Sequence, residues 1–172
     1  MRLNWLRIKN GMTKSLNVAL ILLVAVLVMD VVWGVFTRYA LGEQAQWTEE
    51  LARFLLVWVS LLGAASAFES QGHLGVDYFV SKFHPEVQKP LAMVTQVIVL
   101  LFAILVFGYG GGRVVADTFL IGQVTPALGW EMGYVYLALP IAGIFMMVYT
   151  VENLAQVFIS EPGESEMAEG EL

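Results

Sequence analysis

The residues of this sequence that could do chemistry are a few charged side chains within or beside long apolar runs. Asp30 lies about fifteen residues into the first run, and Arg53 stands just inside the second. An unpaired charge inside a bilayer costs up to about 3 kcal/mol on insertion scales, so such residues pair or mark a transport pathway. The two residues have similar expected depths, and an Asp30–Arg53 ion pair is our hypothesis. The alternative is that Asp30 is a proton or cation site.

Two further acids, Glu49 and Glu50, precede Arg53 by four and three residues and share a helix face with it. Carboxylates at the start of a helix also suit its positive dipole end, and Trp47 beside them suits a membrane interface. These residues therefore have a purely structural interpretation. Arg53 needs only one of the two carboxylates as an ion-pair partner, however. We therefore expect the second carboxylate to be available to another chain or loop.

Patterns typical of enzymes and of metal or haem sites are missing from the sequence. It has no cysteine, and its only histidines, His73 and His84, lie between two of the apolar runs. A haem-binding helical bundle needs axial ligands, usually histidines, inside the bundle. No basic patch typical of nucleic-acid binding is present either. We therefore expect no enzymatic activity, no bound cofactor or metal and no nucleic-acid partner for this chain.

Four apolar runs dominate the composition, which is 58% hydrophobic and 14% charged, against about 25% charged in soluble domains. Each run has roughly the twenty residues that a helix needs to cross a hydrocarbon core about 30 Å thick. Helices satisfy their own backbone hydrogen bonds there, whereas open strands do not. We predict an all-α membrane protein in which residues 1–160 form one domain with four transmembrane helices, at about 15–39, 48–68, 91–110 and 134–158.

The segments between the runs carry weaker signals. The loop 69–90 has a helical apolar stripe, which predicts a short amphipathic helix in the membrane interface between the second and third spans, with Pro85 opening the third. A loop folded back on the bundle is the alternative. We interpret "GYGGG" (108–112) as a loosened helix end, place Asp117 in an outer loop, and expect Pro140 to kink the fourth helix. The acidic tail, 161–172, is predicted to be disordered.

The positive charges predict an orientation. Six of the nine lysines and arginines precede the first run or lie between the second and third. Cytoplasmic segments carry this excess, so the amino terminus and the 69–90 loop are expected in the cytoplasm, and four spans place the carboxyl terminus there as well.

Small residues recur along the second run at helical spacing, which lets another helix approach closely in lipid. They mark packing inside the bundle or against another subunit, and the sequence does not choose between the two. The residues are Ser60, Gly63, Ala64 and Ala67.

Taken in order, these features resemble a known family. Residues 36–79, "FTRYALGEQAQWTEELARFLLVWVSLLGAASAFESQGHLGVDYF", are similar to the DctQ-like small membrane subunit of tripartite ATP-independent periplasmic (TRAP) transporters, and residues 125–147 resemble its entry into the last helix. The matching residues are Arg38, Trp47, Glu49, Glu50, Arg53, Gly63, Ala64, His73 and Asp77.

The resemblance implies a multi-pass subunit of the bacterial inner membrane that acts as a scaffold in a secondary, sodium-coupled symporter. Its implied partners are a large elevator-type membrane subunit, a periplasmic substrate-binding protein and the surrounding lipids. The sodium and substrate sites would lie in the large subunit, and the solute would be an organic acid such as a C4-dicarboxylate or sialic acid. Glu49, Glu50 and Arg53 would organise the outer end of the bundle. The alternative function is an autonomous small carrier, coupled to protons or cations through Asp30.

Overall fold

The computed structural model describes residues 2–43, 45–69 and 85–159, which form four helical rods. The first two rods are single helices, and the last two are divided. Four helical stretches in the described residues are long and apolar enough to cross a membrane, which confirms the all-helical prediction. The segments are α1 (Arg2–Ala40), α2 (Gln46–Glu69), α4 (Pro85–Phe102), η1 (Ala103–Gly110), α5 (Gly111–Ile121), α6 (Met132–Tyr136) and α7 (Ala138–Ile159).

The third rod corrects the expected boundary at "GYGGG". Its helix runs through these glycines, first as the π-helical segment η1 and then as α5, and it ends at Gly122, whose φ of +65° suits glycine. Gly111 serves close packing, because a Cβ at this position would lie 2.9 Å from the Cβ of Leu139. Asp117 is therefore on a helix rather than in a loop, and it pairs with Arg113 at 3.8 Å on an exposed surface.

The fourth rod is divided where a proline predicts it. Leu137 separates α6 from α7, and Pro140 lies three residues further on. Proline has no N–H to donate to the carbonyl four residues earlier, so the helix cannot continue through it unchanged. Pro85 does open α4, as expected. The predicted interfacial helix falls mainly on residues 70–84, and the acidic tail on 161–172; both lie outside the described residues and stay predictions.

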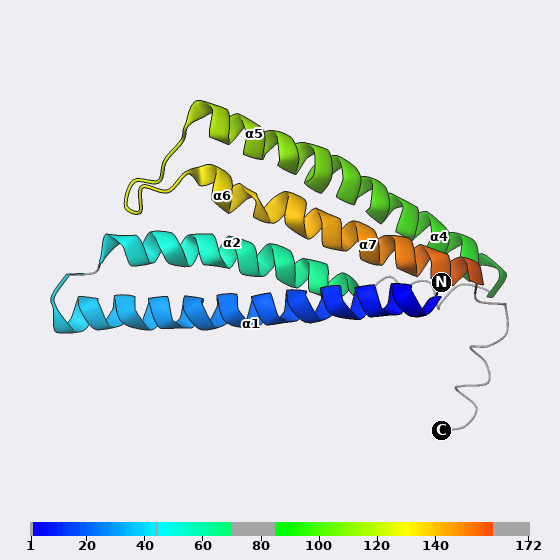
Figure 1. Cartoon of the computed structure of the whole chain (residues 1–172), viewed down its shortest axis with the longest axis horizontal. Coiled ribbons are helices and arrows are strands. Elements are labelled where there is room, and N and C mark those ends of the chain that lie inside the picture. The colour runs from blue at the N-terminus through cyan, green and yellow to red at the C-terminus, as the bar shows by residue number, and fades with distance from the viewer. Residues whose placement is uncertain (1, 44, 70–84, 160–172) are drawn as a thin grey trace, which may run out of the picture.

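The four rods lie side by side in one row, in the order α1, α2, α6–α7 and α4–η1–α5 (Figure 1). In the part of the chain that the structure describes, the backbone of α1 approaches that of α2 and of no other helix. We call the end with Arg2 and Ile159 the terminus end. The opposite end, with Ala40 and residues 122–131, is called the loop end.

The core sits where side chains of α1, α2, η1 and α7 meet across one face of α2. The row is therefore curved rather than flat in this part of the molecule. Its buried members are Leu16, Leu62, Ala65, Ala103, Ala142, Met146 and Tyr149.

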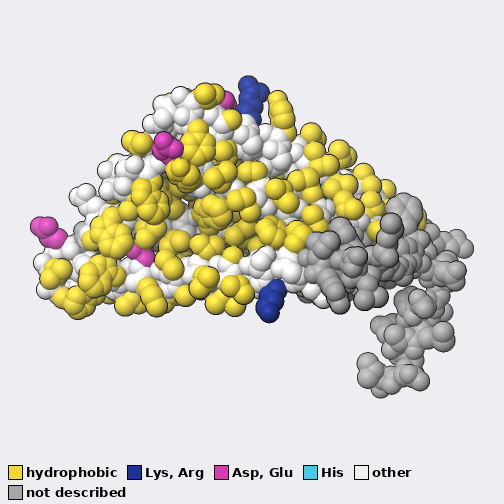
Figure 2. Space-filling view, in the orientation of Figure 1, with side chains coloured by type: hydrophobic (Ala, Val, Ile, Leu, Met, Phe, Trp, Pro, Cys, Tyr) yellow, Lys and Arg dark blue, Asp and Glu magenta, His cyan; other side chains and the backbone are white. Residues whose placement is uncertain are grey.

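Most apolar side chains point outward instead. In the most apolar part of each span, between 6% and 39% of the residues are fully buried. Hydrophobic side chains cover the visible face of the row, and acidic ones gather toward the loop end (Figure 2). A row with so many exposed apolar side chains suits a bilayer and leaves surface for another membrane protein.

Two glycines of this fold should respond in opposite ways to alanine. A Cβ at Gly143 would lie 2.6 Å from the Cβ of Phe107, whereas one at Gly63 meets nothing within 4 Å. We expect Gly143→Ala to lower the free energy of unfolding by about 1–3 kcal/mol, because α7 must move away from η1. Gly63→Ala should be neutral or slightly stabilising. Unfolding of the purified chain in mixed micelles measures both, and equal effects would contradict the packing.

Candidate functional site

The loop between α5 and α6 is held to α2 by one carboxylate. Oε2 of Glu50 accepts hydrogen bonds from the backbone N–H groups of Ala127, at 2.9 Å, and Leu128, at 2.8 Å. The loop itself is tight: the N–H of Thr125 donates to the Trp130 carbonyl at 2.8 Å. A charged acceptor shared by two N–H groups makes a strong contact. The expectation that the second acid serves another chain or loop is thus confirmed for a loop of this chain.

Glu49 forms an ion pair with Arg53, four residues further along the exposed surface of α2. Oε1 of Glu49 lies 3.2 Å from Nη2 of Arg53, and both side chains are 71% exposed. An exposed pair at this spacing contributes only about 0.3–0.5 kcal/mol. Both residues also line an open pocket of about 300 Å³ beside Pro126. This charged surface at the loop end is accessible to a partner.

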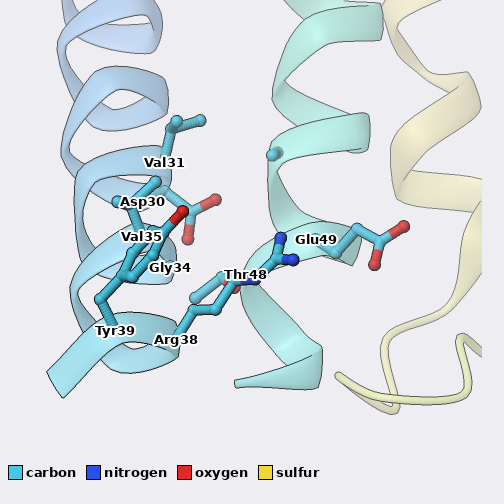
Figure 3. A pocket seen from close by; sticks show the side chains of 9 residues that line it. Asp30, Val31, Gly34, Val35, Arg38, Tyr39, Thr48 and Glu49 are labelled. Carbon is cyan, nitrogen blue, oxygen red and sulfur yellow. The ribbon is translucent and has the colours of Figure 1, made fainter. Parts of the chain in front are cut away.

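A second pocket, which we call the Asp30 pocket, lies between α1 and α2 at the same end. It is open, measures about 290 Å³, and has Asp30 pointing into it from α1 (Figure 3). Arg38, two turns further along α1, reaches toward Thr48, while the Glu49 carboxylate points away from α1. The residues that line the pocket include Asp30, Gly34 and Arg38 of α1 and Thr48, Glu49 and Ala52 of α2.

The hypothesis of an Asp30–Arg53 ion pair is wrong. Arg53 pairs with Glu49, and it lines the pocket beside Pro126 rather than the Asp30 pocket. Asp30 itself is 6% exposed, and neither of its carboxylate oxygens has a hydrogen-bond partner among the described residues. Similar depth was not enough for pairing, because Arg53 lies on another face of α2.

The other residues singled out from the sequence are dispersed. Trp47 is 40% exposed at the start of α2. Ala64 is exposed on α2, and a Cβ on Gly63 would meet no atom of the described residues within 4 Å, so α2 is uncovered at these two positions. Arg38 lines the Asp30 pocket. His73 and Asp77 fall outside the described residues. Among the residues that are described, no three His, Cys, Asp or Glu side chains gather as a metal site.

Sequence reasoning missed a polar cluster at the terminus end, which we call the α1–α7 clamp. Nζ of Lys9 lies 2.9 Å from Oε1 of Glu152, and the Thr13 hydroxyl lies 3.3 Å from that of Tyr149. Tyr149 is 1% and Glu152 8% exposed. The clamp joins the first helix to the last across α2. No local signal predicts it, because its members are 136 and 143 residues apart.

Comparison with known proteins gives one consistent match. Residues 23–159 match the sequence model of the DctQ component of tripartite ATP-independent periplasmic transporters. The chain is similar to the sialic acid TRAP transporter small permease protein of Vibrio cholerae serotype O1, with 30% identity over 77% of this chain and 75% of that protein. It is also 28% identical to a putative TRAP transporter small permease protein of Haemophilus influenzae, over 88% of this chain and 92% of that protein.

A third similarity extends to a longer protein. The sialic acid TRAP transporter permease protein of Haemophilus influenzae strain 86-028NP is 26% identical over 76% of this chain, but the matched part is only 20% of that protein. A sequence of this kind therefore also occurs as one part of a much larger permease.

The Glu50 contact generates a local prediction. Glu50→Ala removes the acceptor for two N–H groups, and a hydrogen bond to a charged group contributes about 1.5–3 kcal/mol. We expect amide hydrogen exchange at Ala127 and Leu128 to accelerate by about tenfold to a hundredfold, measured by mass spectrometry on the chain in nanodiscs. The matched control is Glu49→Ala on the neighbouring acid, which should leave both amides unchanged. Equal exchange in the two variants would contradict the contact.

The α1–α7 clamp generates a second prediction. Lys9→Met leaves the Glu152 carboxylate nearly buried beside an apolar chain, which should lower the free energy of unfolding by about 1–3 kcal/mol. Glu152→Gln in the same chain should recover part of that loss, because the buried charge that Lys9 neutralised is then absent. A double-mutant cycle in mixed micelles measures the coupling. Strictly additive effects would show that the two side chains do not interact.

Proposed function

The chain belongs to the DctQ family of small membrane subunits of tripartite ATP-independent periplasmic transporters, and we propose that its role there is that of a scaffold. It is a multi-pass membrane protein, and subunits of this kind work with a large permease subunit. In the proposed role it packs against that subunit along the row of helices and holds it in the bilayer, with no transport or enzymatic chemistry of its own.

The observation that carries the proposal is the uncovered face of α2. Ser60 and Ala64 are exposed, and a Cβ on Gly63 meets no atom of the described chain within 4 Å. Leu56, on the same face, is 56% exposed. Small residues at helical spacing let a second helix approach closely, and in lipid such packing replaces the hydrophobic driving force. A helix of the large subunit fits this surface.

The proposal also includes the orientation of the chain in the membrane and the other components of the transporter. The terminus end faces the cytoplasm of a bacterium and the loop end faces the periplasm, in agreement with the distribution of lysine and arginine. The pocket lined by Glu49, Glu50 and Arg53 then faces the side from which a substrate-binding protein approaches. The solute is an organic acid, as the sialic acid relatives suggest by name. Sodium and solute bind the large subunit, and this subunit holds no cofactor.

One observation favours a second function, an autonomous carrier that uses Asp30. The carboxylate is buried and has no hydrogen-bond partner among the described residues, and an acid within a span is a candidate proton or cation site. The two functions are distinguished by reconstituting the purified chain alone in proteoliposomes. A scaffold moves no labelled sialic acid or dicarboxylate under a sodium or proton gradient. Uptake that Asp30→Asn abolishes would establish the carrier instead.

The scaffold role predicts the outcome of a pull-down from mild-detergent extracts of native membranes. The tagged chain should recover one large multi-span protein in about equal amount, identified by mass spectrometry. Ala64→Leu should lower that recovery at least about fivefold, since a bulky side chain keeps the partner helix away. Ala116→Leu is the matched control, because it places the same substitution at an exposed position of α5. If the unmodified chain recovers only itself, the proposed function is wrong.

A further inference from the structure

The Asp30 pocket holds a group that the chain itself does not satisfy. Asp30 is 94% buried in an open pocket, and its carboxylate points into the space between α1 and α2 (Figure 3). Neither oxygen has a hydrogen-bond partner in the described part of the chain. A buried acid retained in a span is expected to have a partner, and the described residues do not contain it.

The base that lines the pocket does not take this role. Arg38 is eight residues from Asp30 on α1, about 12 Å along the helix axis. Its side chain reaches toward Thr48 on α2, at the mouth of the pocket (Figure 3). No ion pair joins Arg38 to any described residue, Asp30 included. The pocket is therefore lined by Asp30 and Arg38 without an ion pair between them, and Glu49, which also lines it, directs its carboxylate away from α1 (Figure 3).

The depth of Asp30 fits a side chain that enters from a neighbouring helix. The span Lys9–Ala40 has 32 residues and is about 48 Å long, so it extends beyond a hydrocarbon core of about 30 Å. If the core is centred on the span, Asp30 lies about 7 Å inside its boundary at the loop end. Lysine and arginine bury their aliphatic stems at such depths while directing the charged group toward a polar site.

The pocket also continues into the surface of α2 that we propose binds the large subunit. Its wall on α2 includes Ala52, and Leu56, Ser60 and Gly63 follow at spacings of four, four and three, on one helix face. A helix lying along the small residues of α2 passes the opening between α1 and α2. It can then place a side chain in the pocket beside Asp30.

We propose that Asp30 is the docking point for a lysine or arginine side chain of the large membrane subunit. This inference rests on the proposed function and names the chemistry of one contact in it. The carboxylate and the incoming cation neutralise each other out of water, so the contact fixes the axial position of the partner helix. Because a buried charge left without its partner is strongly unfavourable, the contact disfavours any register that leaves Asp30 unpaired.

The test compares the isolated chain with its complex. Asp30→Asn should reduce recovery of the large subunit in the pull-down by about tenfold or more, because one member of a buried charge pair is lost. The isolated chain should keep its melting temperature or gain a little, since the carboxylate accepts no hydrogen bond from any residue that the structure describes. Asp117→Asn, which removes an exposed acid at the same end, is the control and should change neither quantity.

A photo-crosslinking residue at Val35, which lines the pocket, identifies the group that enters it. The expected product joins Val35 to a peptide of the large subunit with a lysine or arginine within one helical turn. Reversing that base to glutamate should disrupt the complex, and adding Asp30→Lys should restore it. Full recovery with Asp30→Asn, or a crosslink to lipid alone, would overturn the docking point. If even the unmodified chain recovers no large subunit, the proposed function fails first.

Discussion

The structure depends on one constraint: within a bilayer, every polar group must find its partner in the protein. Helices meet that constraint for the backbone, and the chain meets it for most charges by keeping them at the two ends. Glu49, Glu50 and Arg53 stand at the loop end, and Lys9 and Glu152 at the terminus end. Between these ends Asp30 is the buried acid that the described chain leaves unmatched. The open row of helices and its exposed apolar faces follow from the same constraint, since lipid or a partner covers them.

Two polar contacts give this row its shape. At the terminus end the α1–α7 clamp draws the first and last helices together over a core that includes Leu16 and Tyr149. At the loop end Glu50 accepts two hydrogen bonds that hold the 125–130 loop to α2, and the rods spread apart (Figure 1). The row of helices is therefore firmly packed at its terminus end, whereas its loop end has open pockets on its surface.

Features of the fold and the site that depend on residues close together in the sequence were predictable, and features that depend on which helices pack together were not. The four spans follow from runs of apolar residues, and the break near Pro140 follows from a missing N–H; both are local. The pairing of Glu49 with Arg53 is local too. The loop bound by Glu50, the clamp between Lys9 and Glu152 and the solitary position of Asp30 all depend on which helices become neighbours. The glycines at 108–112 misled for the same reason: at Gly111 the missing side chain lets Leu139 of α7 approach closely.

The even number of rods has a consequence for how such chains evolve. Because α1 begins and α7 ends at the same end of the molecule (Figure 1), a polypeptide that crosses these four spans returns to the side on which it started. A polypeptide joined behind α7 would therefore start on that same side. Such a fusion leaves the topology of these four spans unchanged, and related sequences do occur within longer permeases.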